Sequence, residues 1–404
     1  MRIRASWLIT AAAASALVFA TSAGCSSTAK TKTQKEEATE HWNQARAAVL
    51  AGLARDQYQS GNFDKCRTTL NEALRIDPKN SRLHVLAAKL AIEQAELETA
   101  DRELKTAREI DPKDAEADYL AGVVAQRWQK NQLALEYYET AATKAPNELP
   151  YVLAKAEMLV VMDRDEEALA LLQDRAAFFE HSAVIRDAAG QLLMQMKRYP
   201  EAVQTLRQAS VLATDDMGIR EHLAFATLYN KQYREAADLF TRILKDEKFQ
   251  KRSELFLAQG ECFLQAKKPA EARTSFESAV QLSPSELAAY TGLAKASLEL
   301  NDLRRADLAV RKAMAIDQKS SEVHLLAGYV RLRENKLSQA LDAFKRASQL
   351  DHNDTVSLCM IGYTLEKSGK QEQAMQYYSK ALRMNPKDAM AQQMMGTVAT
   401  VGGD

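Results

Sequence analysis

The sequence predicts an all-α solenoid of about ten helical hairpins, followed by a C-terminal capping helix. Three observations support this prediction. The same pattern of small and large residues returns every 34 residues, each period holds two amphipathic helical patterns, and prolines close several of the periods. The 46% share of apolar residues, with few glycines or prolines outside turns, is also typical of folded helix.

Residues 355–388 show the period most clearly. Two helical patterns, at roughly residues 356–368 and 371–384, are joined by a turn at Gly369 and closed by Pro386, which cannot continue a helix. Two extra residues around 248–252 interrupt the register, and we expect them in a loop. The repeats start at Ala47, Ser81, Ala115, Leu149, Ala183, Met217, Ser253, Leu287, Ser321 and Thr355.

Three positions of the repeat, each forming a column when the repeats are aligned, should determine how its helices pack. The eighth position is Ala or Gly in every repeat, and the twentieth is Ala except for Cys66 in the first. Bulk at either position would push the two helices of a hairpin apart. The twenty-fourth position is large throughout, from Leu70 to Tyr378, and we expect it to fill the seam between one hairpin and the next.

This pattern, with a proline at position 32 of five repeats, resembles the tetratricopeptide repeat over residues 47–388. The resemblance implies a right-handed superhelical solenoid. It also implies a concave groove lined by the first helix of each hairpin, chiefly at positions 2, 5, 9, 12 and 13. Arg175 and Ile243 depart from the small residue usual at position 27, and five repeats lack the closing proline.

The repeats from residue 37 to residue 388 are expected to form one structural domain, because each repeat of such an array contacts only its neighbours. Trp42, Val49 and Leu53 continue a helical pattern upstream of the first repeat, so its first helix should extend and cap that end. Residues 389–404 should form a capping helix and tail, although Met390 and Met394 make this helix more apolar than a solvated cap.

Residues 1–24 read as a secretory signal, with Arg2 and Arg4 before an apolar run and small residues after it. Cys25 follows Ala-Gly, which resembles the lipobox of bacterial lipoproteins, although Ser22 stands where Leu is usual. The resemblance implies an acylated Cys25, with a flexible tether over residues 25–36. An ordinary cleaved signal and an uncleaved anchor remain alternatives, and all three place the repeats outside the cytoplasm.

No motif in the sequence predicts catalysis, a cofactor, a metal site or a small-molecule substrate. The six histidines never stand at metal-ligand spacing, and there is no phosphate loop or nucleophile elbow. Lys and Arg total 54, as do Asp and Glu, so no net basic charge favours nucleic acid. Cys66, Cys262 and Cys359 lie too far apart in a solenoid to pair and should be structural thiols.

The groove positions supply the candidate binding residues. They hold aromatic side chains, which either pack between adjacent first helices or form a hydrophobic strip for a partner, and a row of acids, which are either solvated or orient a basic partner. The Lys and Asn set of the carboxylate clamp known in some relatives is absent. The candidates are Tyr119, Glu157, Asp187, Glu221, Phe225, Tyr229, Glu254, Glu261, Tyr329 and Tyr363.

These patterns favour a non-enzymatic scaffold that is lipid-anchored in the bacterial cell envelope and faces the periplasm, on the inner or the outer membrane. Its partners would be other proteins, held in the concave groove to support assembly or export of envelope components. An accessory subunit or regulator of a cell-wall or polysaccharide-synthesising or secreting enzyme complex is the alternative. Fold alone does not choose between these roles.

Overall fold

The computed structural model describes residues 27–401, and the side chains of residues 38–396. This part of the chain is helical throughout, which confirms the predicted fold class. It divides into two compact units after Tyr151, within a helix. In a repeat array each hairpin contacts only its neighbours, so such a division needs no linker in the sequence.

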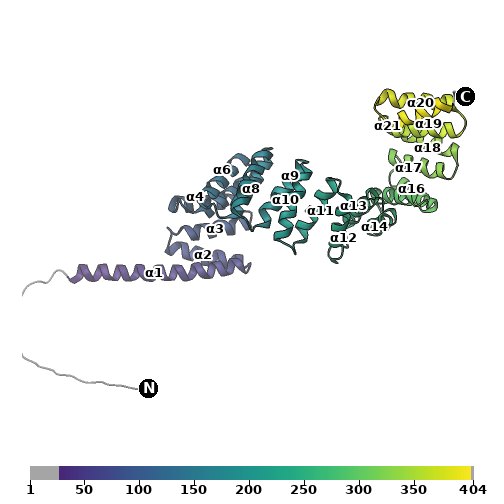
Figure 1. The fold of residues 1–404 in the computed structure, drawn as a ribbon. Helices are drawn as coiled ribbons and strands as arrows, with labels where there is room; N and C mark the ends of the chain where they lie inside the picture. Colours follow the sequence, from purple (N-terminus) through teal and green to yellow (C-terminus); the bar gives the residue numbers. More distant parts are fainter. Residues whose placement is uncertain (1–26, 402–404) are drawn as a thin grey trace, which may run out of the picture. The chain divides into compact units, whose positions relative to one another are not determined.

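The first unit contains six complete helices (Figure 1). They are α1 (Ser27–Gln59), α2 (Phe63–Ile76), α3 (Ser81–Glu93), α4 (Leu97–Ile110), α5 (Ala115–Arg127) and α6 (Asn131–Lys144). Helix α7 (Leu149–Val161) crosses the division.

The second unit continues with α8 (Asp165–Phe178), α9 (Ala183–Gln195), α10 (Tyr199–Leu212), α11 (Met217–Tyr229), α12 (Tyr233–Ile243), α13 (Ser253–Gln265) and α14 (Pro269–Leu282). It ends with α15 (Leu287–Glu299), α16 (Leu303–Ile316), α17 (Ser321–Arg333), α18 (Leu337–Leu350), α19 (Thr355–Lys367), α20 (Gln371–Met384) and α21 (Ala389–Val401).

The helix boundaries follow the 34-residue register. From α3 to α19, the first helix of every hairpin begins at the residue where the register starts a repeat. The two extra residues lie in the loop between α12 and α13. Within each unit, successive helices pack in pairs, such as α3 with α4 and α17 with α18, and neighbouring pairs pack on one another, as α4 does on α5 and α18 on α19.

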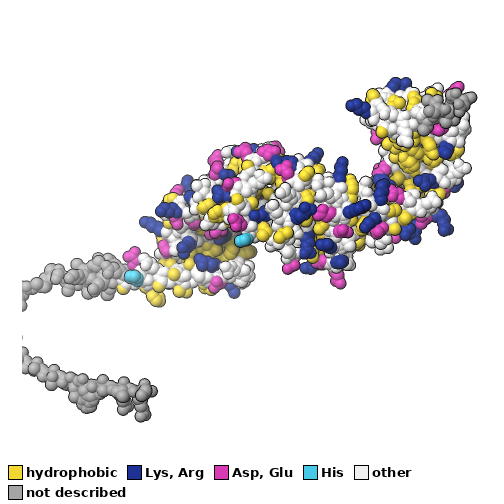
Figure 2. All heavy atoms as spheres, viewed as in Figure 1, with side chains coloured by type: hydrophobic (Ala, Val, Ile, Leu, Met, Phe, Trp, Pro, Cys, Tyr) yellow, Lys and Arg dark blue, Asp and Glu magenta, His cyan; other side chains and the backbone are white. Residues whose placement is uncertain are grey.

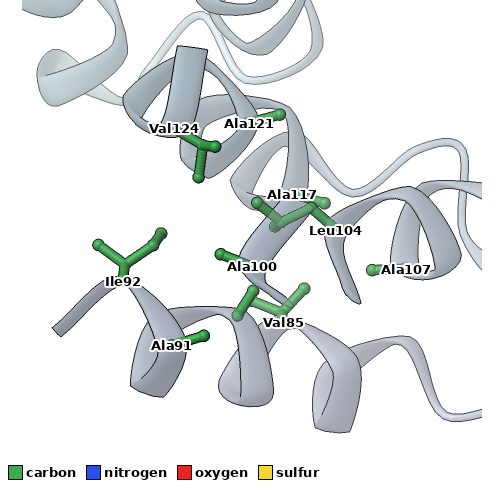
Figure 3. Packing of buried hydrophobic residues seen from close by; sticks show 10 residues of the cluster. Val85, Ala91, Ile92, Ala100, Leu104, Ala107, Ala117, Ala121 and Val124 are labelled. Carbon is green, nitrogen blue, oxygen red and sulfur yellow. The ribbon is translucent and has the colours of Figure 1, made fainter. Parts of the chain in front are cut away.

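The core of the first unit lies between these pairs (Figure 3). Val85 of α3, Leu104 of α4 and Val124 of α5 are buried together with the small residues Ala100 and Ala117. The alanines bring the helix backbones close, and the branched side chains fill the remaining space.

The glycines of the eighth column show why this position is small. A methyl group added at Gly122, Gly260 or Gly328 would lie within 3.0 Å of the aromatic ring at position 24 of the same hairpin, which is Tyr138, Phe276 or Phe344. The large residue at position 24 therefore packs under the first helix of its own hairpin. It also reaches the next hairpin, as expected, because Phe276 would meet a methyl group at Gly292 as well.

The turn inside each hairpin carries a feature that the sequence did not reveal. The fifteenth residue of every repeat has a positive φ near 60° to 75°, yet only Gly61 and Gly369 are glycine. In the second repeat this residue is Ala95, and the next N–H, of Glu96, donates to the Ala91 carbonyl at 2.8 Å. This hydrogen bond closes the helix end, as in a Schellman motif.

Replacing Ala95 by glycine should therefore stabilise the protein. A left-handed conformation costs a residue with a Cβ about 1–2 kcal/mol, part of which the extra entropy of glycine in the unfolded chain offsets. We expect a net gain of about 0.5–1 kcal/mol, measured as a higher urea midpoint. Asn335→Gly is the control with a smaller gain, because Asn tolerates this conformation. A lower midpoint for Ala95→Gly would contradict the strained turn.

Helix α1 departs from two expectations. It is extended upstream, as the pattern predicted, but it begins at Ser27, so most of the tether expected over residues 25–36 is helix. This stretch has no Gly or Pro, and a helix already formed in the repeat can propagate through it at low cost. The apolar residues Trp42, Val49 and Leu53 are exposed and cover no core.

Helix α21 closes the other end of the second unit. Ala391 is buried, and Met390, Met394 and Met395 pack against buried residues of α19 and α20. This packing accounts for the apolar character of the capping helix.

Candidate protein-binding groove

The predicted groove residues all lie on the first helices of their hairpins. Tyr119, on α5, belongs to the first unit. The other nine belong to the second unit and are Glu157 on α7, Asp187 on α9, Glu221, Phe225 and Tyr229 on α11, Glu254 and Glu261 on α13, Tyr329 on α17 and Tyr363 on α19.

Tyr119 is half-buried in a group of tyrosines. Its ring lies 4.8 Å from that of Tyr151 and 5.6 Å from that of Tyr138, centroid to centroid. Burial, with nearby acids, raises the pKa of Tyr151 to about 12, so its hydroxyl stays protonated. This group of tyrosines is mainly packing between hairpins.

The aromatic residues of α11 form a stacked row. Tyr229 is 50% exposed and lies between Phe225, at 6.4 Å, and Tyr199 of α10, at 5.5 Å, measured between ring centroids. Phe225 is half-buried and meets Phe240 of the core edge to face. The structure thus anchors one end of the row in the core and leaves Tyr229 available to a partner.

Tyr329 and Tyr363 belong to a second apolar surface in the same unit. Together with Leu325, Leu332 and Leu341 they are partly buried against the core of α18 to α20. Figure 2 shows hydrophobic side chains gathered over α17 and α18. The Tyr329 ring meets Phe344 edge to face at 5.5 Å, and burial raises the pKa of the Tyr329 hydroxyl. Tyr329 and Tyr363 therefore pack against the core on one side and remain partly accessible on the other.

Three of the predicted acids already have partners within the protein. Arg252, from the two-residue insertion, donates to both carboxylate oxygens of Glu221 at 2.6 and 2.8 Å and to Glu254 at 2.6 Å. These hydrogen bonds raise the pKa of Arg252. Asp187 accepts a hydrogen bond from His222 at 2.8 Å. Because these acids are already paired, they would attract a basic partner less strongly than unpaired acids would.

The other two predicted acids differ in exposure, since Glu261 is half-buried. Glu157 is exposed, and Glu261 accepts a hydrogen bond from the side chain of Gln265, its neighbour one turn along α13. Neither lies in a cluster of acids that the structure brings together.

Two histidines link the stability of the protein to pH. His84 contacts Glu103 at 2.8 Å, and His222 contacts Asp187 at the same distance. In both cases the hydrogen bond to the carboxylate raises the histidine pKa above its ordinary value of 6.5, against the opposing effect of burial. A raised folded-state pKa stabilises the fold fully below the unfolded value, and this contribution is lost as pH rises through the folded pKa.

We therefore expect the melting temperature to fall as pH is raised from about 6 towards 8. His84→Gln, combined with His222→Gln, should flatten this part of the pH profile, because glutamine does not titrate. His352→Gln serves as the control, because His352 is exposed in the turn before α19, and the wild-type slope should persist. A double variant that keeps the full slope would refute the assignment.

The first unit carries a pocket on the same groove positions. It has a volume of about 600 Å³ between α1, α3 and α5, and its lining includes Arg55, Tyr58, Arg82, Leu86 and Lys89. Lys89 pairs with Glu116 at 2.6 Å, whereas Arg55 and Arg82 form no ion pair with the described residues. Basic residues at groove positions of the first two repeats thus line a hollow, whereas Arg127 of the third repeat donates to the Ile92 carbonyl.

The described residues contain no group of three His, Cys, Asp or Glu side chains that could hold a metal ion. Cys66, Cys262 and Cys359 are buried and free, and burial raises the pKa of Cys262 to about 12 and that of Cys359 to about 11. Such thiols are poor nucleophiles at neutral pH. Over residues 27–401, no helix is both long enough and apolar enough for a membrane span.

Sequence reasoning missed Tyr199, Arg252 and the pocket at Arg55 and Arg82. Tyr199 lies on a second helix, outside the groove columns, but it stacks on Tyr229 across the hairpin boundary. Arg252 lies in the insertion, where the register assigns no position. The cations at Arg55 and Arg82 were visible in the groove columns, and only their lack of partners required the structure.

Two family models match the chain. A tetratricopeptide repeat model matches residues 36–90 and 69–123, and the model of the cilia and flagella-associated protein 70 C-terminal domain matches residues 216–402. No curated protein matches the chain.

Solved structures with some likeness include the anaphase-promoting-complex hetero-tetramer Cut9-Hcn1, with 12% identity, coverage of 92% of this chain and 94% of that one, and a TM-score of 0.45. Yeast Tom70 has 13% identity, 89% coverage of each chain and a TM-score of 0.44. MamA from Desulfovibrio magneticus has 15% identity, coverage of 43% of this chain and 98% of that one, and a TM-score of 0.39.

Proposed function

We propose that this chain, which matches tetratricopeptide repeat models over residues 36–123 and 216–402, is a lipid-anchored, non-enzymatic scaffold of the bacterial cell envelope. In this role it holds segments of partner proteins against the first helices of its hairpins, to support assembly or export of envelope components. The proposal has two parts, binding and location, which rest on different observations.

The exposed face of Tyr229 carries the binding part. Tyr229 stands in a row of stacked rings whose buried end is fixed by Phe240, so its orientation costs little entropy when a partner binds. Aromatic side chains held in this way are the usual anchors of protein interfaces. The second apolar surface, at Tyr329 and Tyr363, offers a further contact along the same unit.

The location part is supported by the sequence before the repeats. Arg2 and Arg4, the apolar run, and Ala23-Gly24-Cys25 follow the order of a lipoprotein signal. These residues lie outside the part of the chain that the structure describes. The match of residues 216–402 to the cilia and flagella-associated protein 70 domain favours a second candidate, a scaffold within a cilium or flagellum.

Cell fractionation with mass spectrometry of the mature N-terminus separates the two locations. An acylated Cys25 in the envelope fraction, lost in Cys25→Ser, supports the proposal. A chain that retains residues 1–24 without acylation and co-purifies with ciliary or flagellar structures supports the second candidate.

The binding part is tested by crosslinking in cells, with identification of the crosslinked protein. Tyr229→Ala should reduce the crosslinked partner about 30-fold, since truncation of an anchoring aromatic typically costs about 2 kcal/mol. Leu308→Ala is the matched control, because Leu308 is similarly exposed but lies on α16, a second helix of its hairpin. Loss of the partner in Leu308→Ala, with Tyr229→Ala unaffected, would refute the groove.

A further inference from the structure

Helix α1 carries an apolar stripe that no other described residue covers. Trp42 is 68% exposed, Val49 72% and Leu53 47%, and Ala45 between them is also exposed. A methyl group added at Gly52 would meet no atom within 4 Å. These five residues, Trp42, Ala45, Val49, Gly52 and Leu53, form the α1 stripe.

The α1 stripe lies opposite the side of the helix that packs on the repeats. Ala47 and Ala54 are buried, and Leu50 packs with them against the core of the first two hairpins. At 100° per residue, Ala45, Val49 and Gly52 point about 140–160° away from Ala47. A flat surface could therefore cover the α1 stripe without displacing α2 or α3.

The N-terminal part of α1 buries none of its described side chains, although Arg46 pairs with Glu72 of α2. Every described residue from Ala38 to Arg46 is exposed, and α1 extends beyond the end of α2 (Figure 1). An unsupported helix of this length is marginal in water, and a solvated tryptophan adds nothing to its stability. The outer face of a terminal repeat is usually polar, which the α1 stripe is not.

We propose that the α1 stripe docks on the surface of the lipid bilayer and that α1 lies along the membrane. This inference rests on the proposed acylation of Cys25. Only Ser26 separates Cys25 from the start of α1 at Ser27, so an acylated Cys25 would hold the helix within about 7 Å of its lipid. With an anchor so close to its start, α1 can change its tilt relative to the membrane but cannot move far from it.

Tilt decides where Trp42 lies. Trp42 is fifteen residues beyond Ser27, or about 22 Å along the helix axis. If α1 stands upright, the Trp42 ring is in water, well above the headgroups. If α1 lies flat with the α1 stripe down, the ring enters the interface, which tryptophan prefers because one edge is apolar and the N–H remains hydrated.

Fluorescence of Trp42 distinguishes these orientations. The chain has three tryptophans, of which Trp7 lies before Cys25 and is removed on cleavage there. Trp128→Phe would then leave Trp42 as the sole emitter of the acylated protein. In vesicles of phosphatidylethanolamine and phosphatidylglycerol, lipids brominated on their acyl chains should lower the Trp42 emission about twofold or more, as expected for a ring at the headgroup and acyl boundary.

Val49→Glu with Leu53→Glu should restore most of this emission without releasing the protein from the vesicles, because the acyl chains still hold it. Val211→Glu is the matched control, since Val211 is 71% exposed but lies on α10, and quenching should persist.

Acylated protein whose Trp42 emission is insensitive to bromination would overturn the inference and leave the anchor in place. A blue shift that depends on protein concentration and needs no lipid would also overturn it, because a second copy would then cover the stripe. A chain that mass spectrometry shows to be unacylated at Cys25 would overturn the anchor and, with it, the inference.

Discussion

Replacing Gly328 by alanine should destabilise the protein, although glycine to alanine within a helix usually does the opposite. The added methyl group would lie within 3.0 Å of the Phe344 ring, which is fully buried and would have to shift. Overpacking of this kind costs about 1–3 kcal/mol, more than the roughly 1 kcal/mol that the helix gains from alanine. Gly328→Leu and Ala340→Leu should cost at least as much, and urea unfolding measures each.

Gly52→Ala is the matched control, because the methyl group meets nothing and the variant should be more stable by about 0.5–1 kcal/mol. Lys345→Ala, on the exposed side of α18, should change little. Phe344→Leu should rescue Gly328→Ala, since alanine at position 8 stands with an aliphatic residue at position 24 in four repeats. Equal shifts for Gly328→Ala and Gly52→Ala would show that position 8 is not a close contact.

The register of the repeats could be predicted from the sequence, because close helix packing requires a small residue at the same position of every repeat. Ala or Gly is needed wherever a ring or a leucine at position 24 lies under the first helix, so the columns recur and their phase fixes the helix starts. The pairing is not strict, since Gly190 stands over Leu206 and Ala224 accompanies Phe240. Column identity thus predicts which residues meet, but not how far apart the helices lie.

The backbone conformation at position 15 and the pairing of Arg252 could not be predicted from a recurring residue type. Position 15 adopts a positive φ with Ala, Gln, Asp, Lys or Asn, because the hydrogen bonds at the helix end enforce the turn on whichever residue stands there. Arg252 neutralises Glu221 and Glu254 from an insertion that has no counterpart in other repeats. Arg252 therefore offsets part of the negative charge of the predicted acidic row.

The exposed stripe of α1 shows a limit of periodicity. Trp42, Val49 and Leu53 recur at helical spacing, which normally indicates a face that packs on a core. The same helix also has its repeat-facing residues at Ala47, Leu50 and Ala54, and only these find a partner. Periodicity alone predicts an apolar face, not what covers it.

Removing the cations that pair with a buried carboxylate in the first unit should also lower the stability of the protein strongly. Asp118 of α5 is 1% exposed, and its two oxygens face Arg108 of α4, with Nε at 2.8 Å from Oδ1, and Lys144 of α6. Arg108 also lies over the Tyr137 ring, 4.6 Å from its centroid. The two cations are a quarter to a third exposed, so they keep part of their hydration, whereas Asp118 depends on them entirely.

Arg108→Met with Lys144→Met should therefore destabilise the first unit by about 3–5 kcal/mol, because the variant leaves an uncompensated charge in the core. Asp118→Asn alone should cost less, since both cations can turn to water and the amide retains hydrogen bonds. Adding Asp118→Leu to the double methionine variant should recover most of the loss, because well-packed apolar side chains often replace a buried ion group without cost. Urea unfolding of the wild type and the three variants measures each change. If the triple variant is no more stable than the double one, the loss comes from packing of the cation side chains, and the buried charge is not its cause.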